Sequence, residues 1–467
     1  MPNVPNQAVK PGLLRQLGLY SAVALVISNM VGTVIFGSTG FMAADLGSAG
    51  LIFACWAVGA LFAFAGALSY SELGINFPSS GGEYVYLTRA YGPTWGFMTG
   101  WVSFFAGFSA PIAAAALAFA YYLSYFFPAL KQSAATTIGS GTFSLTIGGA
   151  QAVASLLVLG FTILNCFGVG RTAKVQNVLT GTKIVVIVSF IALGFLAGKG
   201  NWEHFSMTTT RTSTTALPAQ FVISLLWVMV AYSGWNAATY VAEELNRPER
   251  TLPAALAVGT ALVTALFLGL NLIYIYSTPI GEMKGVVAVG SLAASNLFGP
   301  HVAGIFSLLM AVSIMSTVNA MVTIGPRVYY AMAKNKAFFK MAETVHPKWH
   351  TPVVAILCQG ACSMLMTLTP FPQLVVYIGF SLTCFTTLSV ASLFVFRRRP
   401  EWQRMRAVSF AYPLIPAAYL VVGTAMIVYG IIWQPKASLT ALATIGAGAA
   451  VYHFGVRPSN STDIKGS

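Results

Sequence analysis

Long apolar runs fill most of this 467-residue chain and restrict its fold more than any other feature. About twelve runs have roughly 18 residues or more, and each could cross about 30 Å of hydrocarbon as a helix. They are centred near residues 30, 60, 110, 158, 187, 230, 265, 315, 362, 385, 422 and 446. Only 8% of the residues are charged and 57% are hydrophobic, which excludes a soluble globular protein of this size. The sequence therefore predicts an all-α integral membrane protein with about twelve transmembrane helices.

The basic residues indicate how these spans are oriented. The 25 lysines and arginines give a formal net charge of +14, which would also suit a nucleic-acid partner. If twelve spans alternate in direction, 19 of the 25 fall on the side that carries both termini and five on the other, while Lys183 lies inside a span. Loops rich in Lys and Arg remain in the cytoplasm. We therefore expect a multi-pass plasma-membrane protein surrounded by lipid, with both termini cytoplasmic and no nucleic-acid partner.

Two of the spans, about 200 residues apart, are interrupted by glycine. Residues 31–37 (VGTVIFG) lie in the first span, and residues 231–236 (AYSGWN) lie in the sixth. Backbone polar groups inside a bilayer must be hydrogen-bonded, so a loosened helix at this depth is tolerated only beside a protected cavity. Two such helices at corresponding places in two halves are typical of secondary transporters with a midplane binding site. Close helix packing at small residues is the alternative explanation of the glycines.

The same pattern divides the chain into segments. Residues 17–198 and 218–398 each hold five spans and each begin with an interrupted one, so we expect two repeats of opposite topology. Residues 1–16 form an N-terminal cytoplasmic tail, residues 407–455 hold two further helices, and residues 456–467 form a C-terminal cytoplasmic tail.

Several short motifs, in the same order along the chain, resemble those of one family. The most specific is the stretch at residues 234–253, GWNAATYVAEELNRPERTLP. Together these motifs resemble the amino acid–polyamine–organocation transporters over roughly residues 15–440, and their L-type amino acid transporter branch in particular. The resemblance implies a LeuT-type fold of five plus five inverted helices, with helices 1 and 6 broken and two helices added. The other motifs are residues 69–74 (SYSELG), 81–87 (GGEYVYL), 165–169 (NCFGV), 182–183 (TK) and 325–333 (GPRVYYAMA).

The resemblance also implies a substrate site at the two breaks. An amino acid brings a carboxylate and an ammonium into low dielectric, where unpaired charges cost several kcal/mol. The free N–H groups after a break can hold the carboxylate, and the free C=O groups before one can hold the ammonium. The third position of the first break is usually glycine in the family and is Val34 here, and an aromatic residue of the sixth span is replaced by Val230. The substrate-binding residues implied are Ile27, Val31, Gly32, Thr33, Val34, Val230, Ala231, Tyr232, Ser233, Gly234 and Asn236.

Lys183 is predicted to lie about 12 Å inside the fifth span, counted at 1.5 Å per residue. Intramembrane lysines are expensive and mark functional sites, although a lysine that extends to the interface is the alternative. By resemblance, its ammonium would replace the sodium of coupled relatives, between the first and eighth spans. Ser313, Ser316 and Thr317 are the eighth-span neighbours we expect.

The acidic residues suggest a neutral substrate and a cytoplasmic gate. All eleven are predicted at helix ends or in loops, so none would neutralise a cationic side chain at depth. Glu243 and Glu244, close in sequence to Arg247 and Arg250, suggest a charge cluster that closes the cytoplasmic side. A solvated loop would explain the same spacing.

Three function classes remain to be weighed. The first is secondary transport of neutral amino acids by alternating access, as an exchanger or a proton symporter, with a cationic amino acid or polyamine permease as its variant. The second is an amino-acid sensor with little flux, which would need a larger soluble region. An enzyme is not expected, because no cluster of Asp, Glu, His or metal ligands lies at depth, and we expect no cofactor or metal. The loop at residues 127–146 has no cysteine, so we expect no disulfide-linked heavy chain, and a bacterial inner membrane as the location.

Overall fold

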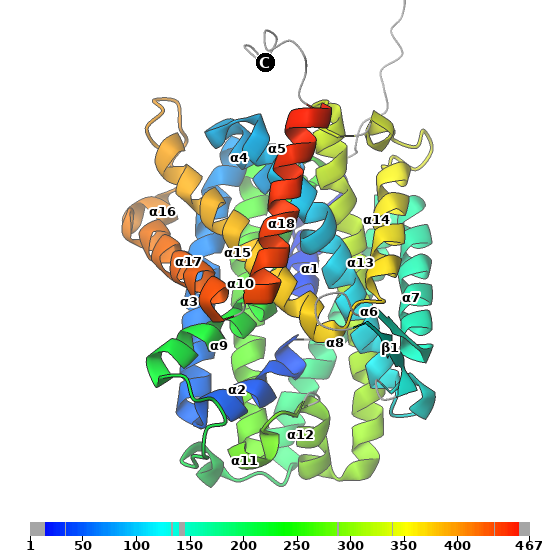
Figure 1. Ribbon diagram of the computed structural model, residues 1–467, viewed down its shortest axis with the longest axis vertical. Coiled ribbons are helices and arrows are strands. Elements are labelled where there is room, and N and C mark those ends of the chain that lie inside the picture. The colour runs from blue at the N-terminus through cyan, green and yellow to red at the C-terminus, as the bar shows by residue number, and fades with distance from the viewer. Residues whose placement is uncertain are drawn as a thin grey trace, which may run out of the picture.

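The computed structural model describes residues 15–32, 34–131, 134–139, 145–286, 289–338, 340–433 and 435–456. These residues are almost entirely helical (Figure 1), and the strands β1 (Thr136–Ile138) and β2 (Leu145–Ile147) form one small antiparallel hairpin. Helices satisfy their own backbone groups, which is what spanning a bilayer requires. Large apolar side chains such as Leu61, Leu156 and Leu365 point outward and are exposed, as lipid contact favours.

The helix bounds agree with the predicted spans. Within the described residues, ten helices are long and apolar enough to cross a membrane. The broken first span and the shorter α14 coincide with the two remaining predicted centres, near residues 30 and 362. The unbroken spans are α3 (Ala49–Asn76), α5 (Pro93–Val102) with η2 (Ser103–Ser109) and α6 (Ala110–Leu123), α7 (Gly149–Cys166), α8 (Val169–Ala197), α10 (Pro248–Ser277), α13 (Pro300–Lys334), α14 (Val353–Met366), α15 (Phe371–Phe396), α17 (Leu414–Trp433) and α18 (Pro435–Val451).

The prediction of two broken spans is confirmed. The first span consists of α1 (Leu19–Met30), a short turn η1 (Val34–Phe36) and α2 (Ser38–Leu46). The sixth consists of α9 (Leu217–Tyr232), a non-helical stretch, and the narrower helix η7 (Ala237–Glu244). Helix α1 lies inside the bundle, where it packs against α8, α10 and α13.

Short helices lie at both ends of the bundle. In Figure 1, α4 lies at the upper end, where α18 also finishes, and α11 and α12 lie at the lower end. Helix α16 lies at the periphery, before α17. The short helices are α4 (Glu83–Tyr91), α11 (Ile280–Met283), α12 (Val289–Phe298), α16 (Arg406–Phe410), η3 (Pro128–Leu130), η6 (Trp202–Phe205), η8 (Lys340–Glu343) and η9 (Tyr452–Val456).

One buried carboxylate connects α3 to the chain that follows α15. Both Glu72 oxygens accept hydrogen bonds from the Arg397 guanidinium, at 2.7 and 2.6 Å. The Trp402 indole N–H donates to Glu72 at 2.7 Å, and the Met405 backbone N–H donates at 3.0 Å. The loop between the tenth and eleventh spans is therefore held against the second span.

Candidate functional site

The two broken spans contact each other at their breaks. Gly234 has φ of 98°, a conformation that side chains rarely adopt. A Cβ placed there would lie 2.7 Å from the Asn29 Cβ and 2.9 Å from the Asn29 carbonyl carbon. Glycine is thus required both for the turn and for the approach of the sixth span to the first.

Hydrogen bonds at the breaks use some of the groups that were predicted to be free. The Val31 N–H donates to the Ile27 carbonyl at 2.8 Å, and the Gly32 N–H donates to the Met30 carbonyl at 2.8 Å. In the sixth span, the Val230 carbonyl accepts from both the N–H and the hydroxyl of Ser233, at 3.2 and 2.7 Å. Some of the backbone donors and acceptors at each break are thus already hydrogen-bonded to neighbouring residues of the same span.

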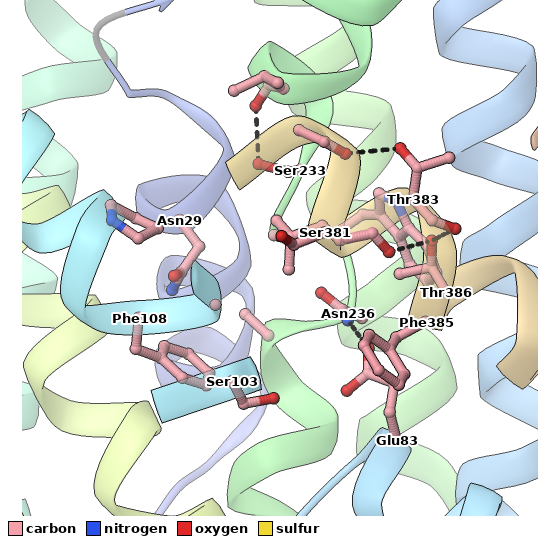
Figure 2. Close-up of a pocket in the computed structure, with 18 of the residues that line it drawn as sticks. Asn29, Glu83, Ser103, Phe108, Ser233, Asn236, Ser381, Thr383, Phe385 and Thr386 are labelled. Atoms are coloured by element: carbon pink, nitrogen blue, oxygen red, sulfur yellow. Dashed lines mark hydrogen bonds between the residues drawn. The ribbon is translucent and has the colours of Figure 1, made fainter. Parts of the chain in front are cut away.

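Two cavities adjoin the breaks. The larger, of about 80 Å³, lies between α1, α6, α15 and the sixth-span break, with Glu83 at one side (Figure 2). The smaller, of about 50 Å³, adjoins both breaks. Val230 and Ser233 line both cavities; Gly234 and Asn236 line the larger, and Gly32, Val34 and Ala231 the smaller.

Three predicted residues lie apart from these cavities, and one is not described. Tyr232 is buried against Trp56 and Phe267, so its ring packs between α3 and α10. Ile27 and Val31 line neither cavity. Thr33 lies outside the described residues.

Lys183 lies against the first break. It is fully buried on α8, and its ammonium donates to the Val31 carbonyl at 2.6 Å and to the Thr317 hydroxyl at 2.8 Å. Thr317 also donates to the Val31 carbonyl at 2.9 Å, so the first, fifth and eighth spans meet here. Ser313 and Ser316 instead donate to carbonyls of their own helix.

A chain of buried polar side chains continues from this contact through the bundle. The Ser28 hydroxyl lies 2.6 Å from that of Thr180, which accepts from the Gln176 amide at 3.0 Å. Asn319 donates to Gln176 at 2.7 Å and accepts from Asn165 at 3.1 Å. These satisfied polar groups fix α1, α8, α13 and α7 relative to one another.

The predicted gate residues have other partners than expected. Glu244 is buried and forms an ion pair with Arg327 on α13 at 2.7 Å, whereas Arg247 and Arg250 are exposed. Glu243 accepts from the Ser79 hydroxyl at 3.0 Å. Glu244 therefore contacts the eighth span and Glu243 the loop between the second and third spans, and a gating role for this segment stays a prediction.

The sequence placed Glu83 within the motif at residues 81–87, as part of a surface facing the gate segment, but did not predict that it lines a cavity. It is the only charged residue that lines the two cavities in the described part of the chain. Its carboxylate accepts from Tyr70, Asn236 and Tyr240 (Figure 2 shows the Asn236 contact). The preceding Gly81 and Gly82, with φ of 135° and 51°, turn the chain inward, and this glycine pair was the available signal.

Other lining residues were also missed. The hydroxyls of Ser381, Thr383 and Thr386 on α15, together with Asn29 on α1, belong to the wall of the larger cavity (Figure 2). Hydroxyl residues are common on transmembrane helices, so nothing in their sequence pattern distinguishes these.

Comparisons with known proteins show which family this chain resembles. The amino acid permease family matches residues 17–449. The serine/threonine exchanger SteT of Bacillus subtilis (strain 168) is 28% identical over 428 residues, which cover 89% of this chain and 92% of that protein. The Homo sapiens large neutral amino acids transporter small subunit 2 is 28% identical, covering 95% and 81%. The Homo sapiens Asc-type amino acid transporter 1 is 27% identical, covering 97% and 84%.

Proposed function

Because the chain belongs to the amino acid permease family, we propose that it carries neutral amino acids across a plasma membrane by alternating access. It would act as an exchanger or a proton symporter. The observation that carries this proposal is the contact of the two broken spans at Gly234 and Asn29, beside a buried cavity. Relatives of similar length are named as amino acid transporters or exchangers, and transport rather than catalysis is the activity of the family.

The substrate would bind through backbone groups at the breaks. Its carboxylate would face the N–H groups of the first break, predicted at Gly32, Thr33 and Val34, where the helix dipole favours an anion. Since the Gly32 N–H already donates to the Met30 carbonyl, the N–H groups that follow it are the better donors. Its ammonium would face carbonyls at the end of α9. Since Ser233 already occupies the Val230 carbonyl, those of Ala231 and Tyr232 are the better acceptors.

A neutral side chain suits the cavities best. Both oxygens of Glu83 already accept hydrogen bonds, and the lining residues supply no second carboxylate within the described chain. A cationic side chain would therefore be buried without a free counter-charge, which costs several kcal/mol.

We further propose that Lys183 occupies the place of a coupling cation. Its ammonium contacts two neutral acceptors, the Val31 carbonyl and the Thr317 hydroxyl, as a bound sodium ion would. It would link the first span to the eighth while the substrate site is closed.

The orientation follows from the distribution of basic residues. We place the end of the bundle that carries α4 and the C-terminal end of α18 in the cytoplasm. The two five-span sets, residues 17–198 and 218–398, would be inverted repeats, and the chain would act in a bacterial inner membrane without a covalent heavy chain. Labelling of single cysteines in intact cells and right-side-out vesicles tests this orientation.

Counterflow in proteoliposomes tests the transport function. Vesicles that contain the purified chain would be loaded with unlabelled alanine, serine, leucine or arginine, and uptake of the same labelled amino acid followed with and without a pH gradient. We expect uptake with the neutral amino acids and little with arginine. Flux with arginine alone would contradict the proposed substrate class. Uptake that requires an internal neutral amino acid and ignores the pH gradient would identify an exchanger, whereas uptake into empty vesicles driven by protons would identify a symporter.

A further inference from the structure

Glu83 differs from the other buried acidic residues that the structure describes. Glu72, Glu83 and Glu244 are all at most 4% exposed. Glu72 pairs with Arg397 at 2.6 Å and Glu244 pairs with Arg327 at 2.7 Å. Glu83 forms no ion pair with any lysine, arginine or histidine among the described residues. A buried carboxylate without a cation is costly and is retained only where its surroundings compensate for the charge.

Three neutral donors provide that compensation. The Tyr70 hydroxyl donates from α3 at 3.0 Å, the Asn236 amide donates from the sixth-span break, and the Tyr240 hydroxyl donates from η7. An ionised carboxylate only accepts hydrogen bonds and can accept all three. A protonated carboxyl carries an O–H of its own, so at least one of these contacts must weaken or rearrange. The bonding of this Glu83 cluster (Glu83, Tyr70, Asn236 and Tyr240) therefore depends on a single proton.

The backbone before Glu83 holds the cluster against the sixth span. A Cβ on Gly82 would lie 2.5 Å from the Tyr240 ring, so the loop approaches η7 as closely as glycine allows. Glu83 then begins α4, outside the long spans, while its side chain reaches the larger cavity (Figure 2). The cluster thus connects the loop between the second and third spans directly to the break in the sixth.

Among the described residues, the ionisable groups that face Glu83 are all phenols, so Glu83 is the acid of this cluster that can change its charge. Four phenols lie close enough to feel its charge, those of Tyr70 on α3, Tyr86 on α4, Tyr240 on η7 and Tyr419 on α17. None of these phenols carries a positive charge. Burial raises the pKa of the Glu83 carboxyl above its usual value. The hydrogen bonds from Tyr240, from the backbone N–H of Glu83 itself, and from Tyr70 and Asn236 oppose this rise.

We propose that Glu83 is a proton-binding site: ionised, it holds the sixth-span break and η7 against α4, and protonated, it releases them. A proton from cytoplasmic water adds to one carboxylate oxygen, and at least one of the three neutral donors then loses or reverses its hydrogen bond. The proposal rests on the transport function above, and it assigns to this carboxyl the closure of the cytoplasmic side. Acidification of the cytoplasmic face then favours opening.

A cysteine reporter in a cysteine-free background tests the release without any substrate. Ser80 is fully buried beside Glu243 at the same end of the molecule, so Ser80→Cys reports whether that end is open. Its reaction with an impermeant maleimide would be followed over a few minutes after a shift from about pH 8 to about pH 5.5, each rate corrected with a small-molecule thiol. We expect the corrected rate to rise roughly tenfold, the value of one hydrogen bond to a charged group. The reporter with Glu83→Gln, which mimics the protonated acid, should react at the fast rate at both pH values.

The controls separate this site from general effects of charge and folding. Glu249→Gln removes an exposed carboxylate from the start of α10 and should leave the pH response unchanged. Glu83→Asp keeps the carboxyl but shortens its reach, so the response should persist with a midpoint at higher pH. Three results would overturn the proposal. The first is a pH response that survives in Glu83→Gln, and the second is no pH response in the reporter with Glu83 intact. The third is an unchanged midpoint in Glu83→Asp. Counterflow of alanine, measured separately, can fail without altering the labelling result, so the transport function and the proton site are tested independently.

Discussion

The two broken spans are each held by one buried charge, and the charges have opposite signs. Lys183, on α8, donates to the carbonyl of Val31 at the first break. Glu83, at the start of α4, accepts from Asn236 at the second. Neither charge forms an ion pair among the described residues, and both are surrounded by neutral hydrogen-bonding groups.

The difference between the two contacts lies in the groups that each side chain touches. Lys183 donates to the backbone carbonyl of Val31 and to the Thr317 hydroxyl, so it holds the first span through the backbone itself. Glu83 holds the second break through side chains, and its own proton changes the number of donors that it can accept. The comparison therefore predicts that the first break is held through its backbone, and the second through side-chain hydrogen bonds that depend on the Glu83 proton.

Gly234→Val would disrupt the contact between the two broken spans and should have the largest effect. The new side chain would overlap Asn29 and force a residue into a positive φ, which costs about 3 kcal/mol or roughly 100-fold in activity. Counterflow per folded protein is the measurement. Gly160→Ala, which meets nothing within 4 Å, is the control and should transport normally. Normal counterflow by Gly234→Val would show that the breaks need not touch.

Lys183→Ala removes the contact at the first break. Two hydrogen bonds from a charged group are lost, each about 1.5 kcal/mol or more, so we expect a fall of at least about tenfold in sodium-free counterflow. Lys174→Ala, an exposed position on the same helix, should change little. Alternating access at the normal rate in Lys183→Ala would argue against any role in coupling.

Tyr240→Phe sharpens the comparison at the second break. The ring remains, and the hydroxyl that donates to Glu83 and accepts from the Asn236 amide is lost. The bond to the carboxylate alone is worth about 1.5 kcal/mol, or roughly tenfold in the opening equilibrium. The Ser80→Cys reporter should therefore react faster near neutral pH, and Tyr20→Phe at an exposed position should leave the rate unchanged. The idea of a closing contact would be abandoned if the two variants reacted at the same rate.

Thr317→Val should have the smallest effect. The hydroxyl that bridges Lys183 and the Val31 carbonyl is lost, but the direct bond between those two groups remains. We expect a loss of about 1 kcal/mol, or roughly fivefold, in counterflow. A loss as large as that of Lys183→Ala would mean that the hydroxyl, and not the ammonium, holds the first break.

The spans and their breaks could be predicted because they depend on local sequence. Apolar runs of sufficient length specify the helices, and Gly32 and Gly234 indicate where two of them are interrupted. The closeness of Lys183 to the eighth span was anticipated through the family resemblance, which also supplied Thr317.

Contacts between distant spans could not be read from the sequence. Glu244 pairs with Arg327, 83 residues away, although Arg247 is only three positions along the chain. From the sequence, Glu83 is predicted at a helix end or in a loop. Its side chain reaches the interior because the chain turns at Gly81 and Gly82. Where a charge is buried depends on the packing of the spans, and periodicity carries no information about that packing.

The four hydrogen bonds that converge on Glu72 have a consequence for how the molecule moves. They attach the loop after the tenth span to the second span, and Tyr419 on α17 stacks against Phe62 on that same span. The eleventh span, α17, is therefore expected to move together with the second, α3. If the transport cycle is a rocking of one group of helices past another, α3 and α17 travel together, and the boundary between the moving groups must lie elsewhere.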